Sequence, residues 1–354
     1  MDINLSCPIN QLGYGVVGLN VFLNLQKKHN VALWPIGPID CEESNYDLLK
    51  NSIEKTKTFN YTAPSIKIWH QFDMASHVGN GKKFGLTFFE TDKIKENEVH
   101  HLNFLEKIFV TSSWAKDVLI NSGIESSKIV IVKLGVDKSL FPESKKDDKK
   151  TTKIVCIGKW EIRKGHDLII DIIEKTFDKD DDFKLIMCCS NPFLSQEEQN
   201  HWISFFEKSK HFDKIIVLKE RLRSQVEVSK IMSGSDVGIF PYRAEAWNLE
   251  LAEMLAMGKH CIATNYSGPT EFAYDAGATL IDSNGIESAY DGKWFDGTAN
   301  WAKLDKKYIS DFSAALRNIH EKKQKDELEI NNSGINYFNE NTWEKSCDKI
   351  IGEL

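Results

Sequence analysis

The sequence predicts two doubly wound α/β domains, and three observations lead to this prediction. Strand-like and helical patterns alternate along most of the chain. A charged segment without large apolar residues, 142–152, interrupts this alternation near the middle. The length of 354 residues also exceeds what one hydrophobic core usually serves. We therefore expect domains at 1–141 and 153–340, joined by a linker at 142–152.

Each domain is expected to contain six short strands, rich in β-branched and aromatic residues. In the first half these strands are Ile3–Ser6, Val31–Trp34, Ile66–Trp69, Phe84–Phe89, Lys107–Thr111 and Lys128–Lys133. In the second half they are Lys153–Ile157, Phe183–Cys188, Lys214–Leu218, Asp236–Phe240, His260–Thr264 and Thr279–Ile281. Helical periodicity lies between them and is the only pattern after about residue 305. Ligands of such sheets bind at the carboxyl ends of the strands, so the crevice between the domains is the expected site.

The composition indicates a globular protein of a reducing compartment. Apolar residues make up 41% and charged residues 27% of the chain, and no apolar stretch is long enough to span a membrane. The N-terminal segment has no basic region followed by an apolar one, so it does not resemble a signal peptide. We expect a cytoplasmic location with at most peripheral membrane contact.

The cysteines and the net charge exclude further classes of protein. Seven cysteines are scattered without a CxxC pair, which favours buried free thiols over a zinc site or a disulfide framework. No His, Asp and Glu set has metal-ligand spacing, so no metal site is expected. The net charge of −7 gives no strong signal for nucleic-acid binding.

The segment Pro241–Phe272 carries the clearest chemical signal. It follows a predicted strand and opens a helix with Asn248 as its expected N-cap. Glu253 is the only charge in an apolar helical run, which is costly unless a partner binds it, and sugar hydroxyls are suitable partners. Glu245 lies just before this helix, where backbone N–H groups favour an anion such as a diphosphate. The spacing alone leaves open that Glu245 is a solvated loop residue and Glu253 a salt-bridged one.

This segment resembles the E-x7-E signature of the family 4 glycosyltransferases (glycosyl transferases group 1), which is followed by a strand and a G-x-x-E. The residues that match are Glu245, Trp247, Asn248, Leu249, Glu253, Met254, Ala256, Gly258, Gly268, Thr270 and Glu271. The resemblance implies that Glu245 holds a hydroxyl of the transferred sugar and that Glu253 holds the ribose of the nucleotide. Asn248 stands where the family usually has Gly, and we expect it to adopt the unusual backbone angles that this position needs.

The segment GKWEIRKG, Gly158–Gly165, resembles the G-R-x-x-x-x-K-G loop of the same family. That loop neutralises the donor diphosphate, which gains charge as the glycosidic bond breaks. Lys164 matches the family Lys, whereas Lys159 replaces the family Arg with a point charge. Either Lys159 suffices or Arg163 takes part. A Lys-rich surface turn is the alternative explanation.

Arginine usage points to the same region, because 40 of the 45 basic residues are Lys. Four of the five Arg lie in loops expected around the crevice, namely Arg163, Arg221, Arg223 and Arg243. Planar bidentate contact to phosphate makes Arg difficult to replace. We expect at least one of Arg221, Arg223 and Arg243 to contact the donor, with ion pairing to a local Glu as the alternative.

A literal G-x-G-x-x-G occurs at Gly13, Gly15 and Gly18. Taken alone it would allow a dinucleotide-binding protein such as an NAD-dependent oxidoreductase. Its first Gly lies several residues beyond the strand Ile3–Ser6, however, rather than at its end. By resemblance it is the Gly-rich N-terminal loop of the family. It is expected to precede a helix at Val16–Lys28 and to approach the donor through Gly13 and Gly15.

His70, Glu90 and Thr91 follow predicted strands of the first half. By resemblance His70 contacts the sugar or the acceptor, and Glu90 with Thr91 forms an acceptor-side site. An ordinary loop histidine is the alternative for His70.

The resemblance as a whole implies a GT-B fold, with two Rossmann-like domains facing a central crevice and a last helix, 341–354, crossing back to the first domain. It implies a retaining, metal-independent hexosyl or other glycosyl transfer from a UDP- or GDP-sugar substrate, without a cofactor. Glu245, Lys164, Lys159 and His70 are the expected catalytic residues, and the donor-binding residues are Glu253, Asn248, Leu249, Trp247, Arg163, Arg243, Gly13 and Gly15. A glycan or lipid-linked sugar is the favoured acceptor. A catalytically inactive nucleotide-sugar-binding protein and a DNA-base glucosyltransferase remain alternatives.

Overall fold

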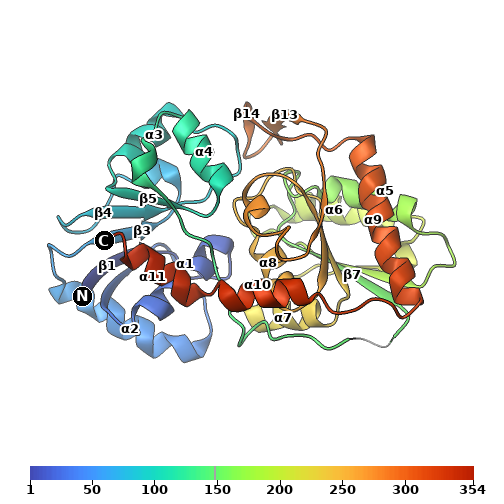
Figure 1. The fold of residues 1–354 in the computed structure, drawn as a ribbon, viewed down its shortest axis with the longest axis horizontal. Coiled ribbons are helices and arrows are strands. Elements are labelled where there is room, and N and C mark those ends of the chain that lie inside the picture. Colours follow the sequence, from blue (N-terminus) through green and yellow to red (C-terminus); the bar gives the residue numbers. More distant parts are fainter. Residues whose placement is uncertain (147–148) are drawn as a thin grey trace. The chain divides into compact units, whose positions relative to one another are not determined.

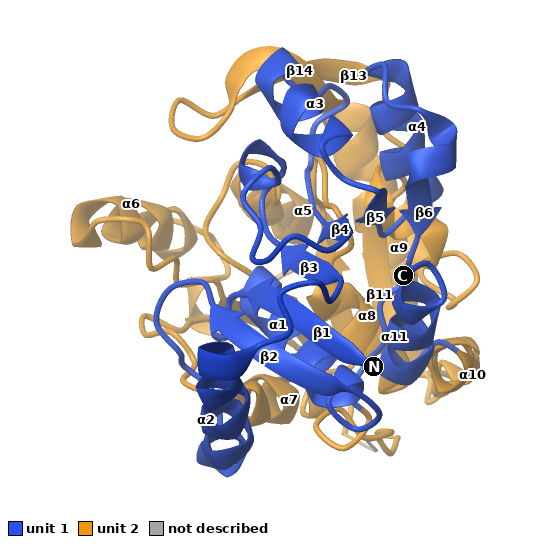
Figure 2. Cartoon of the chain, turned by 90° about the vertical axis from the view of Figure 1, so that its left-hand side faces the viewer, with its two compact units in different colours: residues 1–137, 341–354 blue, residues 138–340 orange. Residues whose placement is uncertain are grey.

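Two six-stranded parallel sheets organise the chain, one in each of two units (Figures 1 and 2). The computed structural model describes residues 1–146 and 149–354. Unit 1 consists of residues 1–137 and 341–354, and unit 2 of residues 138–340. Asp147 and Asp148, part of the predicted linker 142–152, lie outside the described residues. No described helix is long and apolar enough to cross a membrane.

The sheet of unit 1 has the strand order β2-β1-β3-β4-β5-β6. Every neighbouring pair is parallel, and α-helices make each connection between successive strands except that from β3 to β4. The strands are β1 (Asp2–Cys7), β2 (Asn30–Pro35), β3 (Ser65–Ile68), β4 (Lys83–Leu86), β5 (Lys107–Val110) and β6 (Ile129–Ile131). The helices are α1 (Gly13–Leu25), α2 (Tyr46–Glu54), α3 (Glu96–Asn103), α4 (Ser113–Asn121) and α11 (Trp343–Ile351).

The sheet of unit 2 has the order β12-β11-β10-β7-β8-β9 and is also parallel. Its strands are β7 (Thr152–Ile157), β8 (Phe183–Cys188), β9 (Ile215–Val217), β10 (Val237–Phe240), β11 (His260–Thr264) and β12 (Thr279–Ile281). The helices are α5 (Ile169–Thr176), α6 (Gln196–Glu207), α7 (Gln225–Ser233), α8 (Leu249–Ala256), α9 (Lys306–Gln324) and α10 (Asn332–Glu340). Each of the twelve strands in the two sheets overlaps a predicted range, which confirms the predicted doubly wound α/β class.

Each sheet has one point at which its strand order reverses. In unit 1 the chain adds β2 on one side of β1 and then continues with β3 on the other side. In unit 2 it adds β8 and β9 on one side of β7 and then returns to place β10 on the other. Parallel sheets bind ligands beyond the carboxyl ends of the strands at such switch points. We therefore expect ligand-binding sites at the loops after β1 and β3 in unit 1 and at those after β7 and β10 in unit 2.

The last helix, α11, packs on α1 within unit 1, as predicted for 341–354. Its Cys347 is buried, and the Sγ atom lies 3.7 Å from the carbonyl oxygen of Val21 in α1. Ser346 donates to the carbonyl oxygen of Lys133 at 2.6 Å. These contacts fix the C-terminal segment to the domain in which the chain begins.

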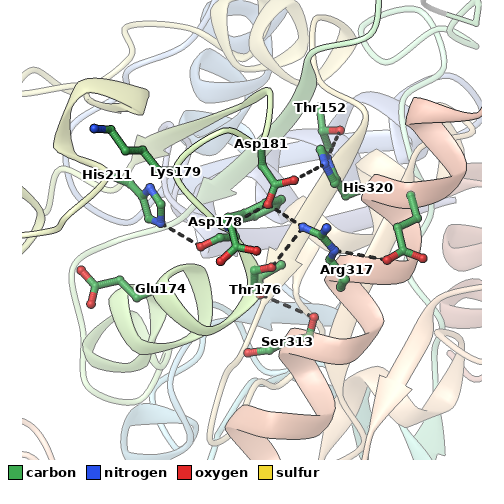
Figure 3. A network of polar contacts seen from close by, with 12 residues as sticks. Thr152, Glu174, Thr176, Asp178, Lys179, Asp181, His211, Ser313, Arg317 and His320 are labelled. Atoms are coloured by element: carbon green, nitrogen blue, oxygen red, sulfur yellow. Dashed lines mark hydrogen bonds and ion pairs between the residues drawn. The ribbon is translucent and has the colours of Figure 1, made fainter.

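A polar network fixes α9 to the amino-terminal side of the sheet of unit 2 (Figure 3). His320 of α9 lies between Thr152, whose Oγ1 is 2.8 Å from Nδ1, and Asp181, whose Oδ1 is 3.3 Å from Nε2. Arg317 also pairs with Asp181, at 2.5 Å. One carboxylate of the acidic run 178–182 therefore anchors a helix.

A two-stranded antiparallel hairpin in unit 2, made of β13 (Ile286–Tyr290) and β14 (Asp296–Ala302), was not predicted. Its strands mix glycine, small and polar residues, so they lack the hydrophobic runs that reveal a buried strand. Trp301 is nevertheless buried there, together with Ala244 and Ala289.

The turn that follows β3 in unit 1 is held by the buried side chain of Lys67 and the half-buried side chain of His77. Lys67 is 5% exposed, and its ammonium donates at 2.7 Å to both the carbonyl oxygen and the Oδ2 of Asp73. The ring of His77 contacts Ser65 through Nδ1 at 3.0 Å. Burial, together with the nearby cation of Lys67, lowers the pKa of His77 to about 4. These contacts hold the segment that carries His70.

The lowered pKa of His77 predicts that stability falls in mild acid. Between pH 6.5 and pH 4 the unfolded chain binds a proton at His77 that the native chain does not, so the free energy of unfolding decreases as the pH falls. The loss at pH 5 should be about 2 kcal/mol, and denaturant unfolding between pH 7 and pH 5 measures it. His77→Asn should remove this part of the pH dependence, whereas His100→Asn at an exposed position should retain it. Equal pH dependence in wild type and His77→Asn would contradict the assignment.

Candidate functional site

The loop Gly158–Gly165 connects β7 to the turn that precedes α5, and its path depends on Gly165. This residue has φ = +70°, a conformation that side chains disfavour. A Cβ atom at Gly165 would lie only 1.8 Å from the carbonyl oxygen of Pro241. The loops after β7 and β10 also share a backbone hydrogen bond. In it, the N–H of Arg243 donates to the carbonyl oxygen of Arg163 at 2.6 Å. The two predicted motifs therefore meet at the switch point of unit 2.

A buried cluster of charges lies where these loops meet. Arg163 donates from Nε and Nη2 to Glu161 Oε2 at 3.0 and 2.7 Å, and its Nη1 lies 2.9 Å from Glu245 Oε2. Lys164 donates to the other oxygen of Glu245 at 2.6 Å. Lys159 lies 3.1 Å from Glu161 Oε1. Three cations and two carboxylates give the cluster a net charge of one positive.

The cations keep both carboxylates ionised despite their burial. Burial opposes ionisation of Glu161, but the cations of Arg163 and Lys159 outweigh it and lower its pKa to about 2. Burial likewise opposes ionisation of Glu245, and Arg163 with Lys164 holds its pKa below the usual range. Burial opposes the charge of Lys164 as well, yet the carboxylate of Glu245 raises its pKa. Glu161, Glu245 and Lys164 are therefore all charged at neutral pH.

The backbone around Glu245 is fixed by the segment that follows β11. Its N–H donates to Ser267 Oγ at 2.9 Å, and its carbonyl oxygen accepts from the N–H of Gly268, also at 2.9 Å. Asn248 has φ = +69°, and its Oδ1 accepts from the N–H of Leu251 at 3.0 Å. Asn248 thus caps α8 in the backbone conformation that was expected for a position where glycine is usual.

The remaining predicted donor residues line up along α8 and the loop before it. Glu253 is 6% exposed and lies among the buried residues of α8. Trp247 is 3% exposed, with its ring 4.4 Å from that of Phe272. Leu249 is the first residue of α8 and is half-buried. Their contacts with a donor remain predictions.

Two of the predicted arginines hold the loops rather than lying free. Arg243 makes a bidentate ion pair with Asp167 at 2.8 Å and donates to the carbonyl oxygen of Ile162 at 2.6 Å. Arg163 uses four of its five N–H groups on Glu161, Glu245 and the carbonyl oxygen of Ala244. Arg163 is thus held on the two carboxylates. Donor contacts of Arg163, Arg243, Arg221 and Arg223 remain predictions.

The switch point of unit 1 holds an aromatic group. The ring of Tyr14, in the first turn of α1, lies 5.5 Å from Trp69 and 4.6 Å from His70, which follow β3. Its hydroxyl donates to the carbonyl oxygen of Phe88 at 3.0 Å and accepts from the N–H of the same residue. His70 stacks on Phe72, which is 51% exposed, with ring centroids 5.2 Å apart. Tyr14 was not predicted, because it lies inside the glycine motif, which drew attention to the glycines alone.

The glycine motif differs from the expected loop. Helix α1 begins at Gly13, so the glycines lie in its first turns and not in a loop before Val16. A Cβ at Gly15 would meet Asn10 at 2.3 Å, and one at Gly18 would meet the carbonyl oxygen of Pro8 at 2.2 Å. Because Gly15 and Gly18 have no side chains, the segment that follows β1 can pack directly against α1. Only Gly13 of the three has open space beside it, and its donor contact remains a prediction.

Glu90 and Thr91 lie beyond the carboxyl end of β4, as expected. Both are half-buried, and Thr91 donates to the carbonyl oxygen of Lys93 at 3.1 Å. An acceptor contact of either residue remains a prediction. Glu161, like Tyr14, is a site residue that was not predicted from the sequence. The signal for it was a carboxylate placed between three cations in GKWEIRKG.

Comparison with known proteins agrees with this geometry. Residues 151–290, which contain both the loop Gly158–Gly165 and the helix α8, match the family Glycosyl transferases group 1. The match lies within unit 2. The resemblance to family 4 glycosyltransferases is therefore confirmed. No curated protein sequence matches the chain.

Solved structures show that the whole chain has the GT-B fold. Sucrose-phosphate synthase from Thermosynechococcus elongatus superposes with a TM-score of 0.71 at 13% identity, covering 99% of this chain and 98% of the other. HepE from Anabaena in complex with UDP-glucose gives 0.69 at 12% identity, with the same coverage. Trehalose-6-phosphate synthase OtsA gives 0.70 at 9% identity over 100% of this chain and 98% of the other. These likenesses confirm the predicted fold class.

Because Gly165 lies so close to Pro241, adding a single methyl group at Gly165 should lower the stability strongly. Gly165→Ala adds the strain of a left-handed conformation, about 1–2 kcal/mol, to a collision with Pro241. Gly285→Ala is the matched control in the same unit, because it has φ = +81° but no atom within 4 Å of its Cβ position. Denaturant unfolding should therefore show a loss of about 1–2 kcal/mol for the control and a clearly larger loss for Gly165→Ala. Equal losses would mean that the contact with Pro241 is not needed.

Proposed function

We propose that the protein is a retaining glycosyltransferase that moves a sugar from a nucleotide-sugar donor to a hydroxyl acceptor. The observation that carries the proposal is the buried carboxylate of Glu245, held by Arg163 and Lys164 where the two motif loops meet. An ionised carboxylate accepts hydrogen bonds only, and sugar hydroxyls supply donors. The match to glycosyl transferases group 1 and the GT-B fold support the same function.

The donor diphosphate is proposed to bind at the cationic side of this cluster. Lys164 offers three N–H donors and spends one of them on Glu245, so it can contact a phosphate without leaving its carboxylate partner. Lys159 is more exposed, with a side chain 33% accessible, and supplies a second cation. The first turn of α8 adds backbone N–H groups that favour an anion. UDP-glucose is the first donor to test, because HepE is known in complex with it.

The sugar and the nucleoside are proposed to bind to two glutamates, Glu245 in the loop before α8 and Glu253 in α8. Glu245 would accept from a hydroxyl of the transferred sugar, and Glu253 from the hydroxyls of the ribose. Both glutamates are buried, and a carboxylate accepts hydrogen bonds from hydroxyls, which both the sugar and the ribose supply.

Catalysis is proposed to rest on charge stabilisation of the leaving nucleoside diphosphate. As the glycosidic bond breaks, negative charge develops on the phosphate oxygen, and Lys164 and Lys159 would stabilise it in place. With these cations supplied by the chain, the transfer is proposed to need no metal. A donor phosphate oxygen would take the proton of the acceptor on the same face of the sugar, so that the anomeric configuration is retained.

The acceptor is proposed to bind unit 1 at its switch point. His70 would adjust the position of the sugar or the acceptor, and Glu90 with Thr91 would supply further polar contacts. A glycan or a lipid-linked sugar is the proposed acceptor class. The observed aromatic surroundings of His70 suit the apolar face of a sugar ring. NAD binding through Gly13–Gly18 is not proposed, because Asn10 and Pro8 fill the space beside Gly15 and Gly18.

Donor binding and turnover can be tested with UDP-glucose and a GDP-sugar. Lys164→Met should weaken UDP binding about 10- to 100-fold, the range expected when a hydrogen bond to a charged group is lost, as measured by calorimetry. Lys175→Met, at an exposed position on α5, is the matched control and should bind as wild type does. Release of free sugar or of a glycoside with retained configuration, followed by NMR, should stop in Glu245→Gln.

Three outcomes decide between the candidate functions. Binding together with transfer that Glu245→Gln abolishes supports the enzyme. Binding of the donor without transfer to any hydroxyl acceptor or to water would favour an inactive nucleotide-sugar-binding protein. Unaltered UDP affinity in a folded Lys164→Met variant would overturn the proposed diphosphate site.

A further inference from the structure

Cys156, His166 and Cys189 come together in the core of unit 2, at both ends of the loop Gly158–Gly165. Cys156 precedes the loop by two residues, His166 follows it directly, and Cys189 follows β8. Their Sγ and imidazole nitrogen atoms all lie within 4.8 Å of one another. The three residues are 2%, 2% and 0% exposed. Sequence spacing does not reveal this cluster, because the two cysteines are 33 positions apart.

The separations fit the ligand shell of a thiophilic cation. With metal–sulfur bonds of about 2.3 Å and metal–nitrogen bonds of about 2.0–2.1 Å, tetrahedral ligands place sulfur and nitrogen about 3.6 Å apart. The observed distance from Cys189 Sγ to His166 Nε2 is 3.6 Å. Two thiolates and one imidazole are a soft donor set that selects Zn²⁺ or Cd²⁺ over Mg²⁺ and Ca²⁺.

A disulfide between the two cysteines fits this geometry less well. In the parallel register of β7 and β8, the partner of Cys156 is Met187, and Cys189 lies two residues further along. A strand that continued in this register would place the two Cα atoms about 8 Å apart. Disulfides need Cα atoms closer than about 7 Å. The cluster therefore suits a shared cation better than a direct sulfur–sulfur bond.

The proton of His166 connects this cluster to the charged loop. The N–H of Glu161 donates to His166 Nδ1 at 3.3 Å, so the neutral ring carries its proton on Nε2, which faces Cys189. When a cation binds Nε2, the proton of the neutral ring must lie on Nδ1. Nδ1–H and the N–H of Glu161 would then be two donors that face each other without an acceptor. The peptide of Glu161 would then have to move. The carboxylate of Glu161 holds Lys159 and Arg163, so this movement would disturb the cations of the charged cluster.

We propose that Cys156, His166 and Cys189 form a binding site for one thiophilic divalent cation, and that occupation of this site opposes binding of a nucleoside diphosphate to the loop Gly158–Gly165. On binding, the two thiols release their protons to water, and the imidazole proton moves from Nε2 to Nδ1. The cation site rests on its own geometry. Only the opposition to the nucleoside diphosphate rests on the proposed function.

Cadmium titration of the full-length chain tests the site, because cadmium thiolates absorb in the ultraviolet. All proteins in the test carry Cys41→Ser, since Cys41 is the one cysteine that is not buried. The absorption should saturate at one Cd²⁺ per chain and should be lost in Cys156→Ser and in Cys189→Ser. His166→Gln should weaken Cd²⁺ binding at least ten-fold. Cys188→Ser, adjacent in sequence but outside the cluster, is the matched control and should retain the absorption.

The coupling is measured by UDP calorimetry with and without saturating Cd²⁺. In the parent protein, UDP affinity should be at least ten-fold lower with Cd²⁺ than without it. In Cys189→Ser, Cd²⁺ should leave the UDP affinity unchanged. Absence of the absorption in the Cys41→Ser parent protein, or its retention in both cysteine variants, would overturn the cation site. Unchanged UDP affinity in the loaded protein would overturn the coupling. A protein that shows the absorption but never binds UDP would instead contradict the proposed function.

Discussion

The carboxylate of Glu245 must stay ionised in a buried position, and much of unit 2 is arranged around that requirement. Arg163 and Lys164 each contact one of its oxygens, and Glu161 in turn fixes Arg163 from the other side. Removal of one member would leave an uncompensated buried charge, which costs several kcal/mol. The cluster therefore couples the stability of two loops to the charges that a donor would meet.

The topology of the sheet explains why these residues meet at all. The loops after β7 and β10 are more than seventy residues apart in the sequence, yet β7 and β10 are neighbours at the switch point of the sheet. Gly165 then lets the first loop approach Pro241, and Arg243 bonds to its backbone. A parallel sheet brings the loops together, and close backbone contact turns their proximity into a defined arrangement of charges.

Most of the fold could be predicted from the sequence, because each strand of the two sheets is a short apolar run between helical segments. The hairpin β13–β14 could not, since its strands are mostly polar and small residues and depend on tertiary packing of Trp301. The start of α1 at Gly13 was also missed, because three glycines argue against a helix unless neighbouring chain fills the space beside them.

The candidate site, too, could be predicted from the sequence only in part. Glu245, Lys164 and Asn248 were predicted as site residues from the resemblance of their segments to family motifs, and Asn248 adopts the expected backbone conformation. The commitment of Arg163 to two carboxylates could not be predicted, because Glu161 and Glu245 approach it only in the folded sheet. The grouping of Cys156, His166 and Cys189 is likewise a product of strand pairing rather than of sequence spacing.

A crystal structure of the full-length protein with UDP-glucose tests the central claim most directly. The account predicts that Lys164 Nζ lies within hydrogen-bond distance of a diphosphate oxygen. It also predicts that Glu245 remains on Arg163 and accepts from a hydroxyl of the sugar. A diphosphate bound without contact to Lys164 or Lys159, or a sugar that does not reach Glu245, would contradict it.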